Sequence, residues 1–107
     1  MSKYEAILDE LGMKMSIKGY TYWLAAIEYC MGKIESEGYA FCMSEVYNYI
    51  AEKYNTTYSR AERALRHAVE YTPGIEQKIQ EKLKINYKLK NSDFLACLVK
   101  LARMEME

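Results

Sequence analysis

The sequence predicts an all-α fold, a compact domain of six helices, from three observations. Apolar residues recur at three- and four-residue steps in six segments, whereas strand-like alternation is absent. Pro occurs once and Gly five times, so few positions interrupt a helix. Half of the 107 residues are hydrophobic, and a chain of this length can bury a core without disulfides or metal. We therefore expect residues 1–107 to form a single domain.

The first two helices are predicted from their end signals. Ser2 and Glu5 have the spacing of a capping box, and Gly12 is expected to end the first helix. Ser16 is the expected N-cap of the second helix, which precedes a connection containing Gly38. The apolar positions of the second helix recur over several turns, which predicts the central core helix: Tyr20, Trp23, Leu24, Ile27, Met31 and Ile34.

Residues 44–70 have the layout of a helix-turn-helix. The first helix is expected to begin at Ser44, the letters NTT interrupt the periodicity, and a second helix is expected over residues 58–70. Ala51 supplies a small residue where the second helix crosses the first, and Asn55 tolerates a positive φ in the turn. Both threonines of the turn, Thr56 and Thr57, can cap the second helix.

Two further helices complete the predicted fold. The Pro73-Gly74 pair is expected to end the helix-turn-helix, and residues 75–84 place Ile75, Ile79 and Leu83 four apart with lysines opposite. A basic loop follows, and the last helix is expected over residues 92–104.

The predicted second helix of the motif concentrates the arginines of a chain with zero formal net charge. On a helical wheel its apolar residues centre near Ala68, and Arg63 and Arg66 point away from them. Arg60 lies beside them, and residues 58–90 carry eight basic against four acidic residues. Arginine can bind guanine bidentately in the major groove, so this face can read DNA. It can equally be a solvated face with ion pairs of Arg66 to Glu62 and Glu70, and the periodicity leaves both open.

The sequence offers little for catalysis. Cys30, Cys42 and Cys97 lack a C-x-x-C pair and are flanked by apolar residues, so we expect buried, reduced thiols. His67 is the only histidine, and no nucleophile constellation or phosphate-binding glycine loop appears. We therefore expect no enzyme activity, metal, cofactor or small-molecule substrate. Without a signal peptide or membrane span, the chain is expected to be cytoplasmic and to have no membrane partner.

At the stretches IKGYTYW, IAEKYNTTYSRAERALRHAVE and NSDFLA, the sequence resembles a known family. This family is the C-terminal DNA-binding effector domain of the stage-zero sporulation response regulator of endospore-forming Firmicutes. The resemblance implies a six-helix fold with the second helix of the motif in the major groove of double-stranded DNA. It also implies sequence-specific transcription regulation in a nucleoid-associated protein, with RNA polymerase and a second copy on tandem sites as partners.

The resemblance also implies roles for individual residues. It implies that Arg60, Glu62 and Arg63 read the edges of bases. Contacts to the DNA backbone, or supporting contacts, are implied for the other matching positions: Thr56, Thr57, Ser59, Arg66, His67, Lys88 and Lys90.

Two departures from the family pattern leave a second function open. The chain starts at Met1 without a phosphorylated receiver domain, so we expect an excised domain or a regulator that phosphorylation does not gate. The segment after Tyr71 is shorter than in the sporulation regulator, and in the family this region helps to contact RNA polymerase and neighbouring copies. The alternative is a small protein-binding inhibitor or co-regulator, of mobile-element or phage type, on the same scaffold.

Overall fold

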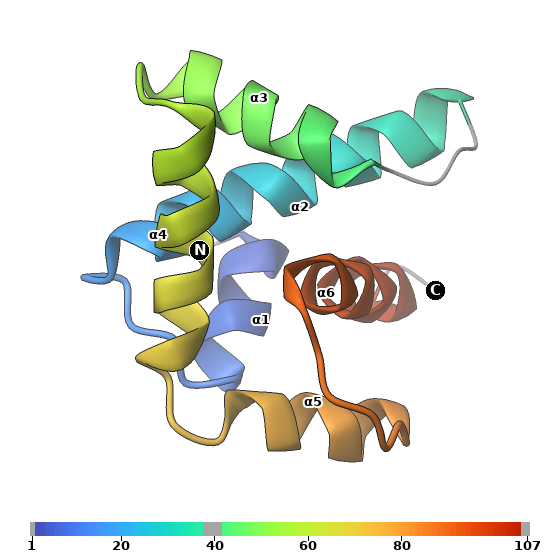
Figure 1. Ribbon diagram of the computed structural model, residues 1–107. Coiled ribbons are helices and arrows are strands. Elements are labelled where there is room, and N and C mark those ends of the chain that lie inside the picture. Colours follow the sequence, from blue (N-terminus) through green and yellow to red (C-terminus); the bar gives the residue numbers. More distant parts are fainter. Residues whose placement is uncertain (1, 38–41, 106–107) are drawn as a thin grey trace.

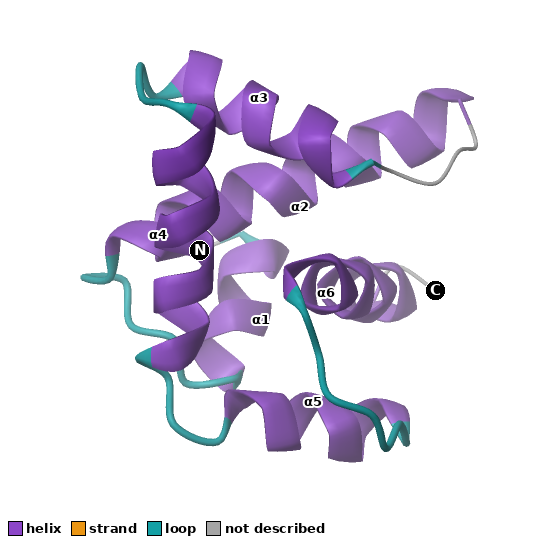
Figure 2. Ribbon diagram, in the orientation of Figure 1, coloured by secondary structure: helices purple, strands orange, loops and turns teal. Residues whose placement is uncertain are grey.

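Six α-helices and no strand make up the part of the chain that the computed structural model describes, residues 2–37 and 42–105 (Figures 1 and 2). Their bounds are α1 Lys3–Glu10, α2 Lys18–Glu37, α3 Met43–Lys53, α4 Tyr58–Glu70, α5 Ile75–Leu83 and α6 Asn91–Glu105. The all-α prediction is therefore confirmed. Within these ranges no helix is both long enough and apolar enough to cross a membrane.

The start of the chain folds as its capping signals predict. The Ser2 hydroxyl accepts from the backbone N–H of Glu5 at 3.2 Å, and the Glu5 carboxylate accepts from the N–H of Ser2 at 3.4 Å. Gly12 ends α1 with a φ of 90°, a left-handed conformation that glycine adopts without steric cost. Farther along α2, the predicted connection at Gly38 lies outside the described residues.

The expected N-cap of α2 is wrong by one residue. The helix begins at Lys18, and Ser16 instead lies in a turn closed by the N–H of Ile17 and the carbonyl of Lys14, 3.1 Å apart. Because Ile17 belongs to this turn, α2 begins at Lys18, one residue later than a cap at Ser16 would place its start. The helix that follows lies at the centre of the fold, because it contacts α1, α3, α4 and α6.

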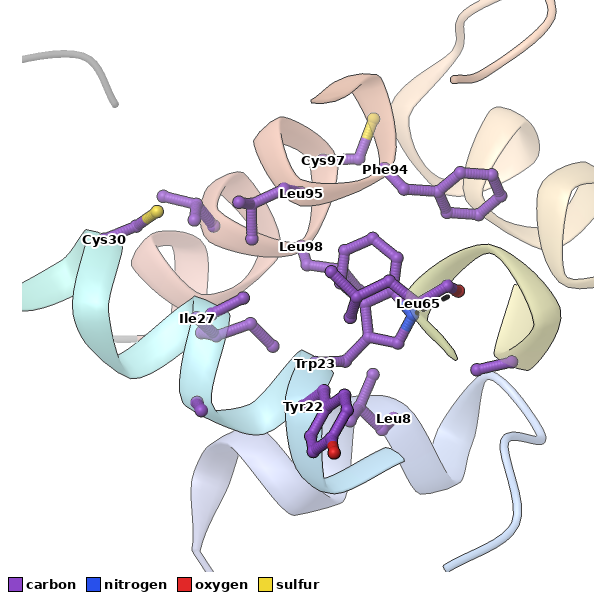
Figure 3. Close-up of a cluster of buried hydrophobic side chains, with 14 of the residues drawn as sticks. Leu8, Tyr22, Trp23, Ile27, Cys30, Leu65, Phe94, Leu95, Cys97 and Leu98 are labelled. Atoms are coloured by element: carbon purple, nitrogen blue, oxygen red, sulfur yellow. Dashed lines mark hydrogen bonds between the residues drawn. The ribbon is translucent and has the colours of Figure 1, made fainter. Parts of the chain in front are cut away.

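The core is organised around Trp23 of α2, whose side chain is fully buried. Its ring packs against Phe94 of α6 with centroids 6.3 Å apart. Its indole Nε1–H donates to the carbonyl of Leu65 in α4 at 3.0 Å, as the dashed line in Figure 3 shows. A buried N–H without a partner would cost about 1–3 kcal/mol, so this bond fixes α2 against α4 as well as satisfying the indole.

The three cysteines do not share one environment. Cys30 and Cys97 are buried as expected, and burial raises the pKa of the Cys30 thiol to about 12. Cys42 is exposed, so its predicted burial is wrong. It directly precedes α3, at the N-cap position of that helix. Hydrogen bonding to Ser44, whose hydroxyl lies 3.1 Å from the thiol sulfur, lowers the pKa of Cys42.

Candidate nucleic-acid interface

The turn between α3 and α4 is closed by backbone hydrogen bonds around a left-handed residue. Asn55 has a φ of 51°, as the sequence predicts. The N–H of Thr56 donates to the carbonyl of Ala51 at 2.9 Å, and that of Asn55 donates to the carbonyl of Glu52 at 3.4 Å. This pair of bonds is a Schellman motif, which normally carries glycine at the left-handed position and accepts asparagine. The turn therefore sets a fixed angle between the two helices.

The second helix, α4, spans the predicted residues 58–70, and one of its two predicted capping threonines forms the cap. Thr57 is the N-cap of α4, and its hydroxyl accepts from the N–H of Arg60 at 3.1 Å. Its neighbour Thr56 is half-buried and holds the turn through its backbone instead. The first helix of the motif begins at Met43 rather than Ser44, and Cys42 occupies its N-cap position without a side-chain cap bond.

The inner face of α4 packs tightly against α2. Ala61, Leu65 and Ala68 of this face are completely buried. They meet α2 at Gly19, where a Cβ atom would overlap the carbonyl oxygen of Ala64 and would lie 2.5 Å from the Cβ of Ala68. The two helices can approach this closely only because the position carries no side chain.

The outer face of α4 carries the predicted site residues. Ser59, Arg60, Arg63 and Arg66 are exposed, whereas Glu62 and His67 are half-buried. His67 packs edge-on against Tyr71, with ring centroids 6.0 Å apart. The separation of a packing face from an arginine face therefore agrees with the helical wheel.

Only one of the two ion pairs expected on this face forms in the described part of the chain. Arg66 Nε lies 3.4 Å from a Glu62 carboxylate oxygen, and Arg66 Nη2 lies 3.5 Å from the other. Glu70 does not pair with Arg66, and neither Arg60 nor Arg63 has a carboxylate within ion-pair distance among the described residues. Two exposed guanidinium groups thus have N–H donors that no carboxylate of residues 2–37 and 42–105 uses.

A loop that precedes α6 presents Lys88 and Lys90 beside α4. Three hydrogen bonds hold this loop: the N–H of Leu89 donates to Glu76 at 2.8 Å, the N–H of Lys90 to Asp93 at 3.0 Å, and Gln80 to the carbonyl of Tyr87 at 2.8 Å. Farther along, the amide of Asn91 donates to the hydroxyl of Tyr47 in α3 at 3.2 Å. The loop is therefore positioned by both α5 and the helix-turn-helix.

The structure brings Lys88 and Lys90 to one side of α4, which we call the Lys88 flank. A cleft there is lined by three basic residues, Arg66, Lys88 and Lys90, and by three acidic ones, Glu62, Glu70 and Glu76. The acidic side chains oppose the approach of a phosphate, whereas the basic ones favour it. The sequence-predicted lysines therefore lie in a cleft of balanced charge.

The opposite side of α4, which we call the Lys18 flank, was missed by the sequence reasoning. A groove between the start of α2 and α4 is lined by Ile17, Lys18, Gly19, Tyr22, Arg60, Arg63, Ala64, His67 and Tyr71. Three of these residues are permanently cationic and none is acidic. The letters IKGYTYW contain this lysine, but only the helix crossing shows that it stands beside the arginines of α4.

A helix-turn-helix with an exposed arginine face on its second helix is the architecture of DNA-binding regulatory domains. Consistent with this class, residues 4–101 match the family described as sporulation initiation factor Spo0A C terminal. The match covers nearly the whole chain, so the protein belongs to this family of DNA-binding transcription-regulatory domains, the response-regulator effectors of sporulation. The family is not a class of enzymes.

Proposed function

We propose that residues 1–107 act as one sequence-specific, double-stranded DNA-binding domain that regulates transcription by placing α4 in the major groove. The unpaired guanidinium groups of Arg60 and Arg63 carry this proposal. Without a carboxylate partner among the described residues, Arg60 and Arg63 keep their N–H donors available to a ligand in place of water. The opposite face of the same helix is buried in the core, so the backbone that carries these donors has a defined position.

The chemistry of the face fits the edges of base pairs. Arg60 and Arg63 can each donate two hydrogen bonds to guanine O6 and N7, and a good pair contributes about 1–3 kcal/mol of discrimination. Glu62 can accept from cytosine N4. Its carboxylate already accepts from Arg66, so base reading by Glu62 requires the two side chains to share or exchange partners.

Phosphate contacts would come from the start of α4 and from the loops beside it. Ser59 is exposed in the first turn, and Thr57, although it accepts from Arg60, keeps its hydroxyl hydrogen for a phosphate oxygen. Arg66, His67, Lys88 and Lys90 remain candidates for supporting contacts. RNA polymerase and a second copy on tandem sites are the proposed protein partners.

The proposal is tested by replacing Arg63 with alanine. Selection from a random duplex pool first defines a preferred site, and fluorescence anisotropy then compares Arg63→Ala with the parent at fixed salt. We expect a loss of about 1–3 kcal/mol on the preferred site, with relaxed preference at one base pair. The matched control is Lys100→Ala, which removes an exposed cation from α6.

Two results would contradict the proposal. Equal affinity of Arg63→Ala and the parent for the selected site would remove the base-reading assignment. Failure to enrich any duplex, combined with a tight protein partner in a pull-down, would favour the protein-binding co-regulator instead. Urea denaturation checks that Arg63→Ala stays folded, since an exposed substitution should change the free energy of unfolding by less than about 0.5 kcal/mol.

A further inference from the structure

The two flanks of α4 differ in charge although each carries three permanently cationic side chains. On the Lys88 flank those cations stand among Glu62, Glu70 and Glu76. On the Lys18 flank no acidic residue lines the groove, and the cations come from two separate helices, α2 and α4. The Lys18 flank is therefore the side with the stronger attraction for an anion.

The position of Lys18 disfavours a purely structural role for it. The residue is exposed and is the first of α2, whose first turn contains no acidic residue. The N-terminal end of a helix carries partial positive charge, so a lysine there destabilises the helix slightly. No ion pair offsets this cost among the residues that the structure describes.

The overall arrangement sets the two flanks on opposite sides of the same helix. In Figure 1 the chain that leads into α2 projects past one side of α4, and the chain between α5 and α6 rises on the other side. A helix that fills the major groove is bordered by two sugar-phosphate backbones, one from each DNA strand. The flanks are thus placed to meet different strands.

We propose that Lys18 binds backbone phosphates of one DNA strand while Lys88 and Lys90 face the other strand, and that Lys18 contributes more to affinity than Lys88. This inference rests on the proposed function, because it takes α4 to lie in the major groove. The greater contribution follows from the three glutamates that line the cleft with Lys88, whereas no acidic residue of the described chain lines the groove with Lys18. Lys18 therefore increases affinity without reading sequence.

Salt dependence of DNA binding tests the proposal. Binding of the parent, Lys18→Gln, Lys88→Gln and the control Lys100→Gln is measured from 50 to 200 mM salt, on the selected duplex and on an unrelated one. Loss of one phosphate contact should reduce the slope of log K against log[salt] by about 0.9. The parent's advantage over Lys18→Gln should then shrink about 3.5-fold across this range, on both duplexes alike. Lys100→Gln should keep the parent slope.

Neutral phosphates assign the strands. Methylphosphonate groups are placed along one strand of the selected duplex at a time, beside the position of α4. Modification of the strand that Lys18 contacts should weaken the parent but should have less effect on Lys18→Gln. Lys88→Gln should show the same insensitivity only when the other strand is modified.

The outcomes separate this inference from the function on which it rests. An unchanged salt slope for Lys18→Gln, or a larger loss of affinity for Lys88→Gln, would overturn the inference. If Arg63→Ala still bound the selected duplex more weakly than the parent, the proposed function would stand. Parent-like binding by Arg63→Ala would remove the function as well. Urea denaturation separates misfolding from the loss of a contact, because Lys18→Gln removes an unfavourable charge and should unfold at the same or slightly higher urea concentration than the parent.

Discussion

The inner and outer faces of α4 are built under opposite constraints. The inner face is held by close contacts with α2, at the crossing with Gly19 and at the hydrogen bond from the indole of Trp23 to the carbonyl of Leu65. On the outer face one ion pair forms at 3.4 Å, and Arg60 and Arg63 have no carboxylate partner among the described residues. The same thirteen-residue helix is therefore closely packed on its inner face, whereas two arginines of its outer face remain available to a ligand.

This difference predicts that stability and DNA binding respond to different substitutions. Changes on the inner face should lower the free energy of unfolding, whereas changes on the outer face should leave it nearly unaltered. Equal losses in the free energy of unfolding for inner-face and outer-face variants would contradict this difference between the two faces.

The largest effect is expected for Gly19→Ala. The added methyl group would meet backbone of α4, which cannot rotate away as a side chain can, so α2 and α4 must separate. Overpacking typically costs about 1–3 kcal/mol, and we expect a loss at the upper end of this range because the clash is with backbone. Urea denaturation followed by circular dichroism measures the loss of stability.

Gly32→Ala is the matched control, because it makes the same change in the same helix. Nothing lies within 4 Å of a Cβ at that position. Alanine is the better helix former, so Gly32→Ala should stabilise the protein by up to about 1 kcal/mol. If Gly19→Ala and Gly32→Ala changed the free energy of unfolding in the same direction, α2 and α4 could not cross closely at Gly19.

An intermediate effect is expected at the N-cap of α4. Thr57→Ala removes the acceptor for the N–H of Arg60 and should cost about 1 kcal/mol, while Thr57→Ser should retain most of the stability. Thr56→Ala is the comparison, since the Thr56 hydroxyl has no role in the cap. Thermal or urea unfolding of the three variants measures the difference, and a larger loss for Thr56→Ala would assign the cap to the wrong threonine.

The smallest effect is expected for Glu62→Gln on the outer face. It removes the charge that holds Arg66, and a half-exposed pair at this spacing contributes less than about 0.5 kcal/mol to folding. Glu70→Gln, which breaks no ion pair of the described residues and removes a negative charge from the C-terminal end of α4, should leave stability unchanged or raise it slightly. Denaturation at low and high salt checks both variants, because the loss of stability expected for Glu62→Gln should disappear on screening.

The sequence predicted those parts of the fold that are encoded locally. A capping box is a pattern of two residues three apart, and the left-handed turn at Asn55 is a property of one residue type, so both can be recognised from the amino-acid letters alone. The errors occurred at the starts of helices, where several local signals compete. A turn at Lys14–Ile17 displaced the start of α2, and the exposure of Cys42 depends on where α3 begins rather than on its apolar neighbours.

The candidate site shows the same division. The periodicity of one helix was enough to place the arginines on its outer face. It could not reveal that Glu76 on α5 balances the charge beside Lys88, or that the close crossing at Gly19 brings Lys18 next to Arg63. Those relations join residues far apart in the chain and exist only after the helices have packed.

The helix crossing at Gly19 has a thermodynamic consequence for recognition. Because Lys18 precedes Gly19 directly, the backbone that carries the lysine is held by the same contact that holds α4. In the proposed complex, the distance between the phosphate that Lys18 contacts and the base edges that α4 reads would be set during folding. Binding would then lose little backbone conformational entropy at this interface, leaving chiefly the side-chain rotamers to be ordered.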